Sequence, residues 1–101
     1  MWRLKDKDGN EYRLDDETWE HIQKFHPEIV SAQLIESILL DPDQIVRSNW
    51  DDQSVLYYQR IKSGRFRVVV VQKVEMRIKT TLTTDKIKRG KVLWVKEKTT
   101  D

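Results

Sequence analysis

Two histidines, His21 and His26, are the only imidazoles in this chain of 101 residues, which has no cysteine. An imidazole exchanges protons near neutral pH, and RNA cleavage by attack of a neighbouring 2′-hydroxyl needs such a group. The two lie five residues apart just before Pro27, a spacing that does not place both on one helical face. Either His26 or His21 is therefore the candidate general base.

A second group of reactive side chains lies in the β-rich half of the sequence. Tyr58 and Arg60 are two residues apart, so on one strand they share a face. A tyrosine hydroxyl can donate a proton, and a guanidinium can hold phosphate through two hydrogen bonds. Thr81 or Thr84 would then orient the phosphate. These residue types predict phosphate chemistry without a metal ion.

Charge is divided unequally along the chain. Residues 1–55 hold 6 basic and 13 acidic residues, whereas residues 56–101 hold 13 basic and 4 acidic residues. A basic half favours a polyanionic partner such as RNA. The basic residues could instead have a purely structural role, on a solvated sheet face or as cations that protect a sheet edge. The candidate RNA-binding residues are Arg65, Arg67, Lys79, Lys86, Lys88 and Arg89.

Alternation along two expected strands divides the side chains between two sheet faces. Residues 65, 67, 69 and 71 would face opposite to 66, 68 and 70, and residues 77, 79, 81 and 83 opposite to 78, 80 and 82. We therefore expect one apolar face covered by helices and one cationic face with hydroxyls. On this basis the cations near Arg60, Lys79 and Lys88 should converge on one surface.

The first 40 residues read as a hairpin and two helices. Alternating apolar residues surround Asp8-Gly9, a pair suited to a tight turn, which predicts a hairpin over residues 1–14. Acidic residues at 15 and 16 open a helix. Pro27 ends that helix and suits the first turn of another, so a second helix is expected over residues 27–40, with His26 at the bend.

After Asp41-Pro42-Asp43 the apolar period changes to two, which indicates strands over 45–48, 55–61, 65–74, 77–83 and 92–95. Short connections favour antiparallel neighbours. The predicted fold class is α+β in a single domain (residues 1–101). Two N-terminal helices (15–40) pack on one antiparallel β-sheet of about four to five strands (44–96), preceded by the short hairpin.

Several classes are disfavoured by composition. Without cysteine there is no disulfide or thiolate zinc site, and two histidines make a metal site unexpected. No glycine-rich phosphate loop can be written, so no cofactor is expected. No apolar run approaches a membrane span and the N-terminus lacks a signal-peptide core. These features predict a cytoplasmic chain with no membrane partner.

Six segments together resemble a known group of domains: Trp19–Glu28 (WEHIQKFHPE), Asp41–Asp43, Leu56–Arg60, Val68–Val71, Thr80-Thr81 and Lys88–Trp94. Their order resembles the small phage- and bacteria-associated nuclease-like domains grouped with barnase, EndoU, the colicin tRNases and RelE toxins (the BECR group). The resemblance covers residues 17–95. It implies a metal-independent RNase, with His21, His26, Tyr58, Arg60 and Thr81 or Thr84 at its site.

Three functions remain open at this point. The first is a metal-independent endoribonuclease, the toxin of a toxin–antitoxin or phage-related system, with RNA such as tRNA as substrate and an acidic antitoxin or immunity protein as partner. The second is a non-catalytic RNA-binding module with the same fold. The third is a protein-interaction domain that uses its acidic and basic halves.

Overall fold

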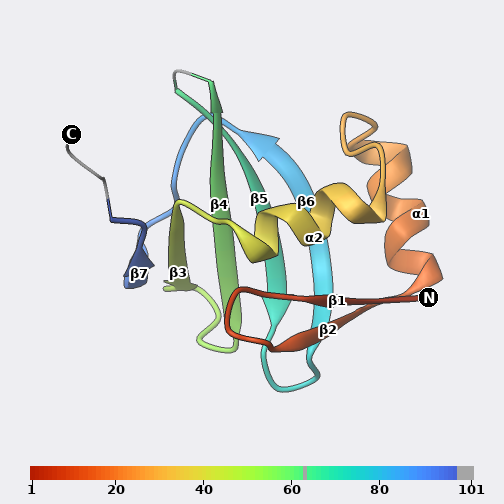
Figure 1. The fold of residues 1–101 in the computed structure, drawn as a ribbon, viewed down its shortest axis with the longest axis horizontal. Helices are drawn as coiled ribbons and strands as arrows, with labels where there is room; N and C mark the ends of the chain where they lie inside the picture. The colour runs from red at the N-terminus through yellow and green to blue at the C-terminus, as the bar shows by residue number, and fades with distance from the viewer. Residues whose placement is uncertain (63, 98–101) are drawn as a thin grey trace.

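A single seven-stranded sheet is the main element of the computed structural model, which describes residues 1–62 and 64–97 (Figure 1). The elements in chain order are β1 (Trp2–Lys5), β2 (Glu11–Leu14), α1 (Asp16–Phe25), α2 (Ala32–Leu40), β3 (Gln44–Ser48), β4 (Ser54–Lys62), β5 (Arg65–Gln72), β6 (Arg77–Thr84) and β7 (Gly90–Val95).

The predicted fold class, two helices on an antiparallel sheet of four to five strands, is wrong. The sheet has seven strands in the order β1-β2-β6-β5-β4-β3-β7, and it is mixed. β2 pairs in parallel with β6 at Arg13 and Arg77, where the Arg13 N–H donates to the Met76 carbonyl at 2.9 Å. The N-terminal hairpin itself forms as expected, but this parallel pair makes it part of the sheet.

Helix α1 begins where the sequence indicates. Asp15 is its N-cap, in extended conformation, and acidic Asp16 and Glu17 occupy the first turn. Negative charge there interacts favourably with the positive end of the helix dipole. The helix ends at Phe25 because Pro27 lacks the N–H that a further turn needs. Neither helix in the described part of the chain is long and apolar enough to cross a membrane.

Helix α2 is shorter than expected. The second helix was predicted over residues 27–40, but it starts at Ala32, so Pro27 does not open it. Ser31 is the N-cap, and its hydroxyl accepts a hydrogen bond from the Leu34 N–H at 3.1 Å. A serine side chain satisfies one of the free N–H groups of the first turn, which explains the later start.

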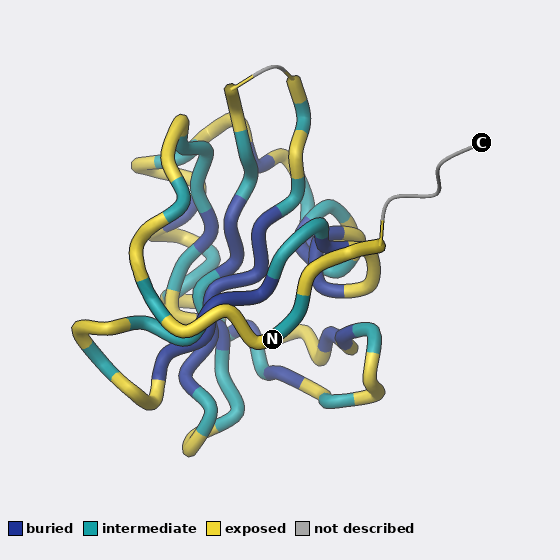
Figure 2. The backbone as a smooth tube through the Cα atoms, turned by 90° about the vertical axis from the view of Figure 1, so that its left-hand side faces the viewer, coloured by how far each residue is buried: buried dark blue, intermediate teal, exposed yellow. Residues whose placement is uncertain are grey.

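The two helices and the hairpin cover one face of the sheet. α1 packs on β6, and α2 packs on β1, β4 and β5; the view in Figure 1 shows α2 and the hairpin crossing in front of the central strands. Tyr12 of β2 reaches Tyr57 of β4, with 3.1 Å between the hydroxyls, although two strands separate them in the sheet. Figure 2 shows the resulting core as buried segments midway along the strands, with exposed ends.

The assignment of the two sheet faces is reversed relative to the expectation along β5, and along β6 from Thr80 onwards. Val69, Val71 and Ile78 belong to the core beneath the helices, whereas Val68 lies in a second buried cluster with Val46, Leu56 and Tyr58. A bulge between Val70 and Val71 shifts the register with β6. Because of that bulge, Ile78 and Thr81 face the same side of the sheet. Strict alternation along β6 therefore assigned the residues after the bulge to the wrong face.

Candidate active site

A sharp turn after α1 holds His26. The residue is the C-cap of α1, with φ −136° and ψ 62°, and its N–H donates to the Ile22 carbonyl. The Ile29 N–H then donates to the His26 carbonyl at 3.0 Å. Ile29 is fully buried in the core, so it anchors the turn. His26 therefore sits at a bend, as predicted, and on a fixed backbone.

The two imidazoles lie near each other at the C-terminal end of α1. Their ring centroids are 6.5 Å apart with planes at 64°. His21 also packs 4.8 Å from the exposed ring of Phe25. The helical spacing alone does not bring His21 and His26 together; the turn at His26 does, because it folds that residue back beside the last helical turn.

Glu28 connects this turn to the end of β6. Its carboxylate accepts a hydrogen bond from the Thr83 backbone N–H at 3.2 Å. Partial burial opposes ionisation of Glu28, but hydrogen bonds from its own N–H and from Thr83, together with the charge of His26, hold its pKa below the usual value. A low pKa keeps the carboxylate ionised at neutral pH. Glu28 was not among the candidates drawn from the sequence.

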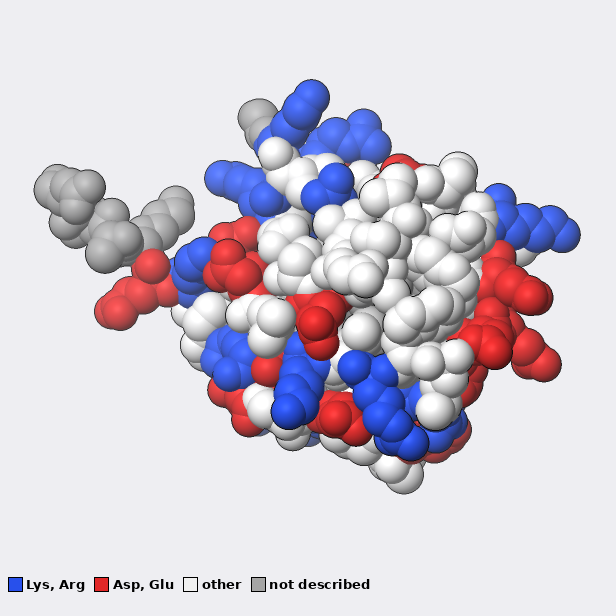
Figure 3. Space-filling model, turned by 45° about the vertical axis from the view of Figure 1, so that its right-hand side comes forward, with Lys and Arg blue, Asp and Glu red and all other residues white. Residues whose placement is uncertain are grey.

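An open cavity of about 510 Å³ lies beside Glu28 and Thr83. Its other lining residues are Ile61, Lys62, Arg65 and Arg67. Arg67 lies opposite Thr83 in the ladder between β5 and β6, so both reach the helix-covered face. Lys62 and Arg65 flank the turn between β4 and β5, and Figure 3 shows blue side chains gathered around that hairpin tip. The cavity thus combines one carboxylate with three cations.

Two buried polar atoms beside this cavity have no hydrogen-bond partner among the described residues. They are Nε of Arg67 and Oγ1 of Thr81. Thr81 is fully buried and lies opposite Val69, two residues further along the ladder from the Arg67–Thr83 pair. Native proteins rarely leave such atoms unpaired without a reason.

Tyr58 and Arg60 are not part of this cavity, which corrects the predicted catalytic set. Their ladder partners are Val68 and Phe66, on the face opposite Arg67. Tyr58 is buried, its hydroxyl accepts the Lys88 N–H at 2.9 Å, and burial raises its pKa. The structure therefore separates the tyrosine and the guanidinium of Arg60 from the His26 turn by the thickness of the sheet.

The cations that were predicted to converge with Arg60 are spread along β6 and the loop after it. Lys79 is near the start of β6, where its Nζ lies 3.2 Å from Ser54 Oγ and 3.5 Å from Asp51 Oδ2. Lys86, Lys88 and Arg89 lie exposed between β6 and β7. Thr84 pairs with Phe66 on the Arg60 face and its hydroxyl contacts the Lys86 backbone. Of the six candidate RNA-binding cations, only Arg65 and Arg67 line the cavity.

Sequence reasoning missed Glu28, Thr83 and Lys62. Glu28 directly follows the His-Pro pair, and a carboxylate beside an imidazole was the available signal. Thr83 was assigned to the face opposite the helices because the bulge is not visible in the sequence. Within residues 1–62 and 64–97, no three His, Asp or Glu side chains are grouped to hold a metal ion.

The chain has no significant match among protein-family models, curated proteins or solved structures. The geometry of the cavity is therefore what bears on function.

Proposed function

We propose that the chain is a metal-independent endoribonuclease whose active site is the cavity between Glu28, Arg67 and Thr83. One observation carries the proposal: an ionised carboxylate, adjacent to an imidazole, opens onto a cavity with three cations. A general base, a general acid and cations that stabilise a phosphorane are the groups that metal-free RNA cleavage requires.

The proposed reaction is an internal transfer of the phosphoryl group. Glu28 accepts the proton of the 2′-hydroxyl, and the 2′-oxygen forms a bond to phosphorus. The bond between phosphorus and the 5′-oxygen breaks, and protonated His26 donates its proton to that oxygen. The products are a 2′,3′-cyclic phosphate and a free 5′-hydroxyl, so atoms and protons balance. Arg65 and Arg67 stabilise the added negative charge.

Glu28 and Arg67 support these roles by position, since both line the cavity. Glu28 is fixed by its hydrogen bond with Thr83, and it is ionised, as a base must be. Arg67 presents a planar fork that suits two phosphate oxygens. His26 is preferred to His21 as the acid because its charge acts on Glu28. His21 packs on Phe25 instead.

The test is incubation of the purified protein with total RNA and tRNA in EDTA, followed by mapping of the cleaved ends. We expect fragments that end in 2′,3′-cyclic phosphate, and losses of about 10²–10⁴ in rate for Glu28→Gln and His26→Ala. Lys79→Ala, at the far end of β6, is the matched control and should cleave normally. Intact RNA across all substrates would overturn the proposal, and salt-sensitive binding without cleavage would identify the chain as an RNA-binding module.

The partners follow from the same site. An RNase in the cytoplasm acts on the RNA of its own cell, so its activity needs an inhibitor. Three cations around the cavity fit an acidic protein, such as an antitoxin or immunity protein, by charge complementarity.

A further inference from the structure

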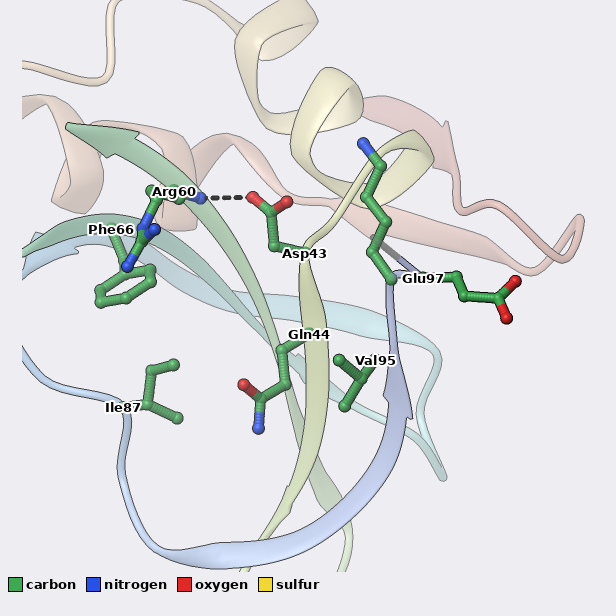
Figure 4. Close-up of a pocket in the computed structure, with 8 residues that line it drawn as sticks. Asp43, Gln44, Arg60, Phe66, Ile87, Val95 and Glu97 are labelled. Atoms are coloured by element: carbon green, nitrogen blue, oxygen red, sulfur yellow. Dashed lines mark hydrogen bonds between the residues drawn. The ribbon is translucent and has the colours of Figure 1, made fainter. Parts of the chain in front are cut away.

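The opposite face of the sheet holds a second cavity, of about 540 Å³ (Figure 4). It is lined by residues of four strands (β3, β4, β5 and β7) and of the segments next to β3 and β7. Those used below are Asp43, Gln44, Arg60, Phe66, Ile87 and Val95. None of them lines the Glu28 cavity.

The aromatic wall of this second cavity is held in place. Phe66 packs edge-on against Tyr58, with 6.2 Å between centroids and planes at 85°. Tyr58 is itself buried and fixed by the Lys88 N–H. The guanidinium of Arg60 lies 5.9 Å from the Phe66 ring. The cavity therefore has a preorganised aromatic surface with a cation at its rim.

The remaining lining combines the apolar Ile87 and Val95 with the Gln44 amide and with the charged residues Asp43, Lys96 and Glu97. In Figure 4, Phe66 and Ile87 lie on one side and Val95 on the other, with the amide of Gln44 projecting into the space between them. A glutamine amide offers both donors and an acceptor. Asp43 is also present, and its carboxylate accepts the Arg60 backbone N–H at 2.7 Å. That negative charge disfavours a ligand that is only an anion.

We propose that this second cavity binds a nucleotide. The base stacks on Phe66 between Ile87 and Val95, its hydrogen-bonding edge meets the Gln44 amide, and Arg60 binds the phosphate. Stacking on an aromatic ring is available to every base, whereas an amide distinguishes donor and acceptor patterns. The ligand class is a purine or pyrimidine with an attached phosphate, either free or within a strand.

The two cavities lie at the same end of the sheet. Arg60 pairs with Phe66, and the next pair along the ladder is Gln59 with Arg67, whose side chains reach the other face. The basic tip of the β4–β5 hairpin lies between the two faces. An RNA strand that crosses this tip reaches both sites, and in this respect the inference rests on the proposed function.

The test uses titration of the isotope-labelled protein with 5′-mononucleotides, with inorganic phosphate as the anion control, monitored by NMR. Nucleotides should shift the signals of Gln44, Phe66 and Val95, and phosphate should not. Phe66→Leu should weaken nucleotide binding about tenfold through lost stacking, and Gln44→Ala should change the preference among the four bases. Equal shifts from phosphate, or no shifts at these residues with millimolar nucleotide, would overturn the inference.

Two variants and a non-cleavable oligonucleotide distinguish this inference from the ribonuclease proposal. Glu28→Gln should abolish cleavage and leave mononucleotide binding unchanged. Phe66→Leu should weaken mononucleotide binding without changing the NMR signals of residues near Glu28. A 2′-O-methyl oligonucleotide cannot be cleaved and reports binding alone. If a mononucleotide displaces this oligonucleotide, the ligand of the second cavity is a nucleotide within a strand. If the mononucleotide and the oligonucleotide bind independently, the ligand is a free nucleotide. Nucleotide binding in a protein that never cleaves RNA would support this inference and reject the ribonuclease.

Discussion

The carboxylate of Glu28 accepts a hydrogen bond from the backbone N–H of Thr83 at 3.2 Å. This contact joins the turn after α1 to the last part of β6 and brings the His26 turn to the cations of the β4–β5 hairpin. Because the donor is a backbone group, side-chain substitutions can separate the structural role of Glu28 from its chemical role.

Glu28→Gln should remove catalysis and preserve the fold. The amide oxygen of glutamine can still accept the Thr83 N–H, but it cannot accept a proton from a 2′-hydroxyl. We expect a rate of RNA cleavage lower by about 10²–10⁴ at an unchanged melting temperature. A variant that cleaves at the wild-type rate would exclude Glu28 as the base.

Arg67→Lys should impair cleavage although the charge is kept. Lysine lacks the planar fork that holds two phosphate oxygens, so we expect a loss of about 10- to 10²-fold in the rate of cleavage. Arg77→Lys is the matched control, because Arg77 pairs with Glu75 at the other end of β6. Equal losses in both variants would point to charge or stability rather than geometry.

Thr81→Val tests a buried hydroxyl that has no partner among the described residues. Removing such a group relieves a desolvation penalty. We therefore expect a stability gain of about 1 kcal/mol, seen as a melting temperature higher by about 4–8 °C. If Thr81 orients the phosphate, the rate of cleavage falls in the same variant; unchanged cleavage would remove Thr81 from the site.

Asp6→Asn should lower stability and weaken its dependence on acid pH. Asp6 is buried and accepts hydrogen bonds from the Asp8 and Asn10 backbones, the Asn10 amide and the Tyr57 hydroxyl. Burial opposes its ionisation, yet these bonds lower its pKa below 3.8. The folded state thus favours the ionised form, so this stabilisation is present above pH 3.8 and is lost as pH falls through the lower folded-state pKa.

For Asp6→Asn we expect a loss of about 1–3 kcal/mol at pH 7, measured by urea unfolding. The same measurement repeated towards pH 2 should show a smaller decline for the variant than for the wild type. A parallel decline would mean that other carboxylates set the acid sensitivity.

Gly90→Ala should loosen the edge strand β7. A Cβ at position 90 would clash with the Arg47 carbonyl and lie 2.7 Å from Val46 Cγ1. The backbone of β7 must then move away from β3, at a cost of about 1–3 kcal/mol. Faster amide exchange in β7, with β4 and β5 unchanged, would confirm the local effect.

Local signals predicted much of the secondary structure. The hairpin, the start of α1 at the acidic pair and the five later strands follow from turn residues, capping and alternation. The Ser31 cap of α2 was not predicted, because the expected start of this helix was taken from Pro27 alone. The parallel pairing of Arg13 with Arg77 has no local signature, because it depends on where the hairpin docks.

The candidate site was predicted only in part. His26 at a bend, Arg65 and Arg67 were identified from residue type and spacing. Tyr58 and Arg60 were grouped with them because alternation alone was used to decide which residues of neighbouring strands lie on the same face of the sheet. One bulge, between Val70 and Val71, reverses that inference on β6, and bulges depend on the partner strand rather than on the residues of one strand.

The pairing of Arg13 with Arg77, and of Ser48 with Gly90, also sets an order of events during synthesis. A ribosome releases the hairpin and both helices long before β6, so a partial chain carries His26 and Glu28 without Arg67 and Thr83. Contacts this distant in sequence close late in folding. An RNase built in this way would stay inert until β6 has emerged from the ribosome that makes it.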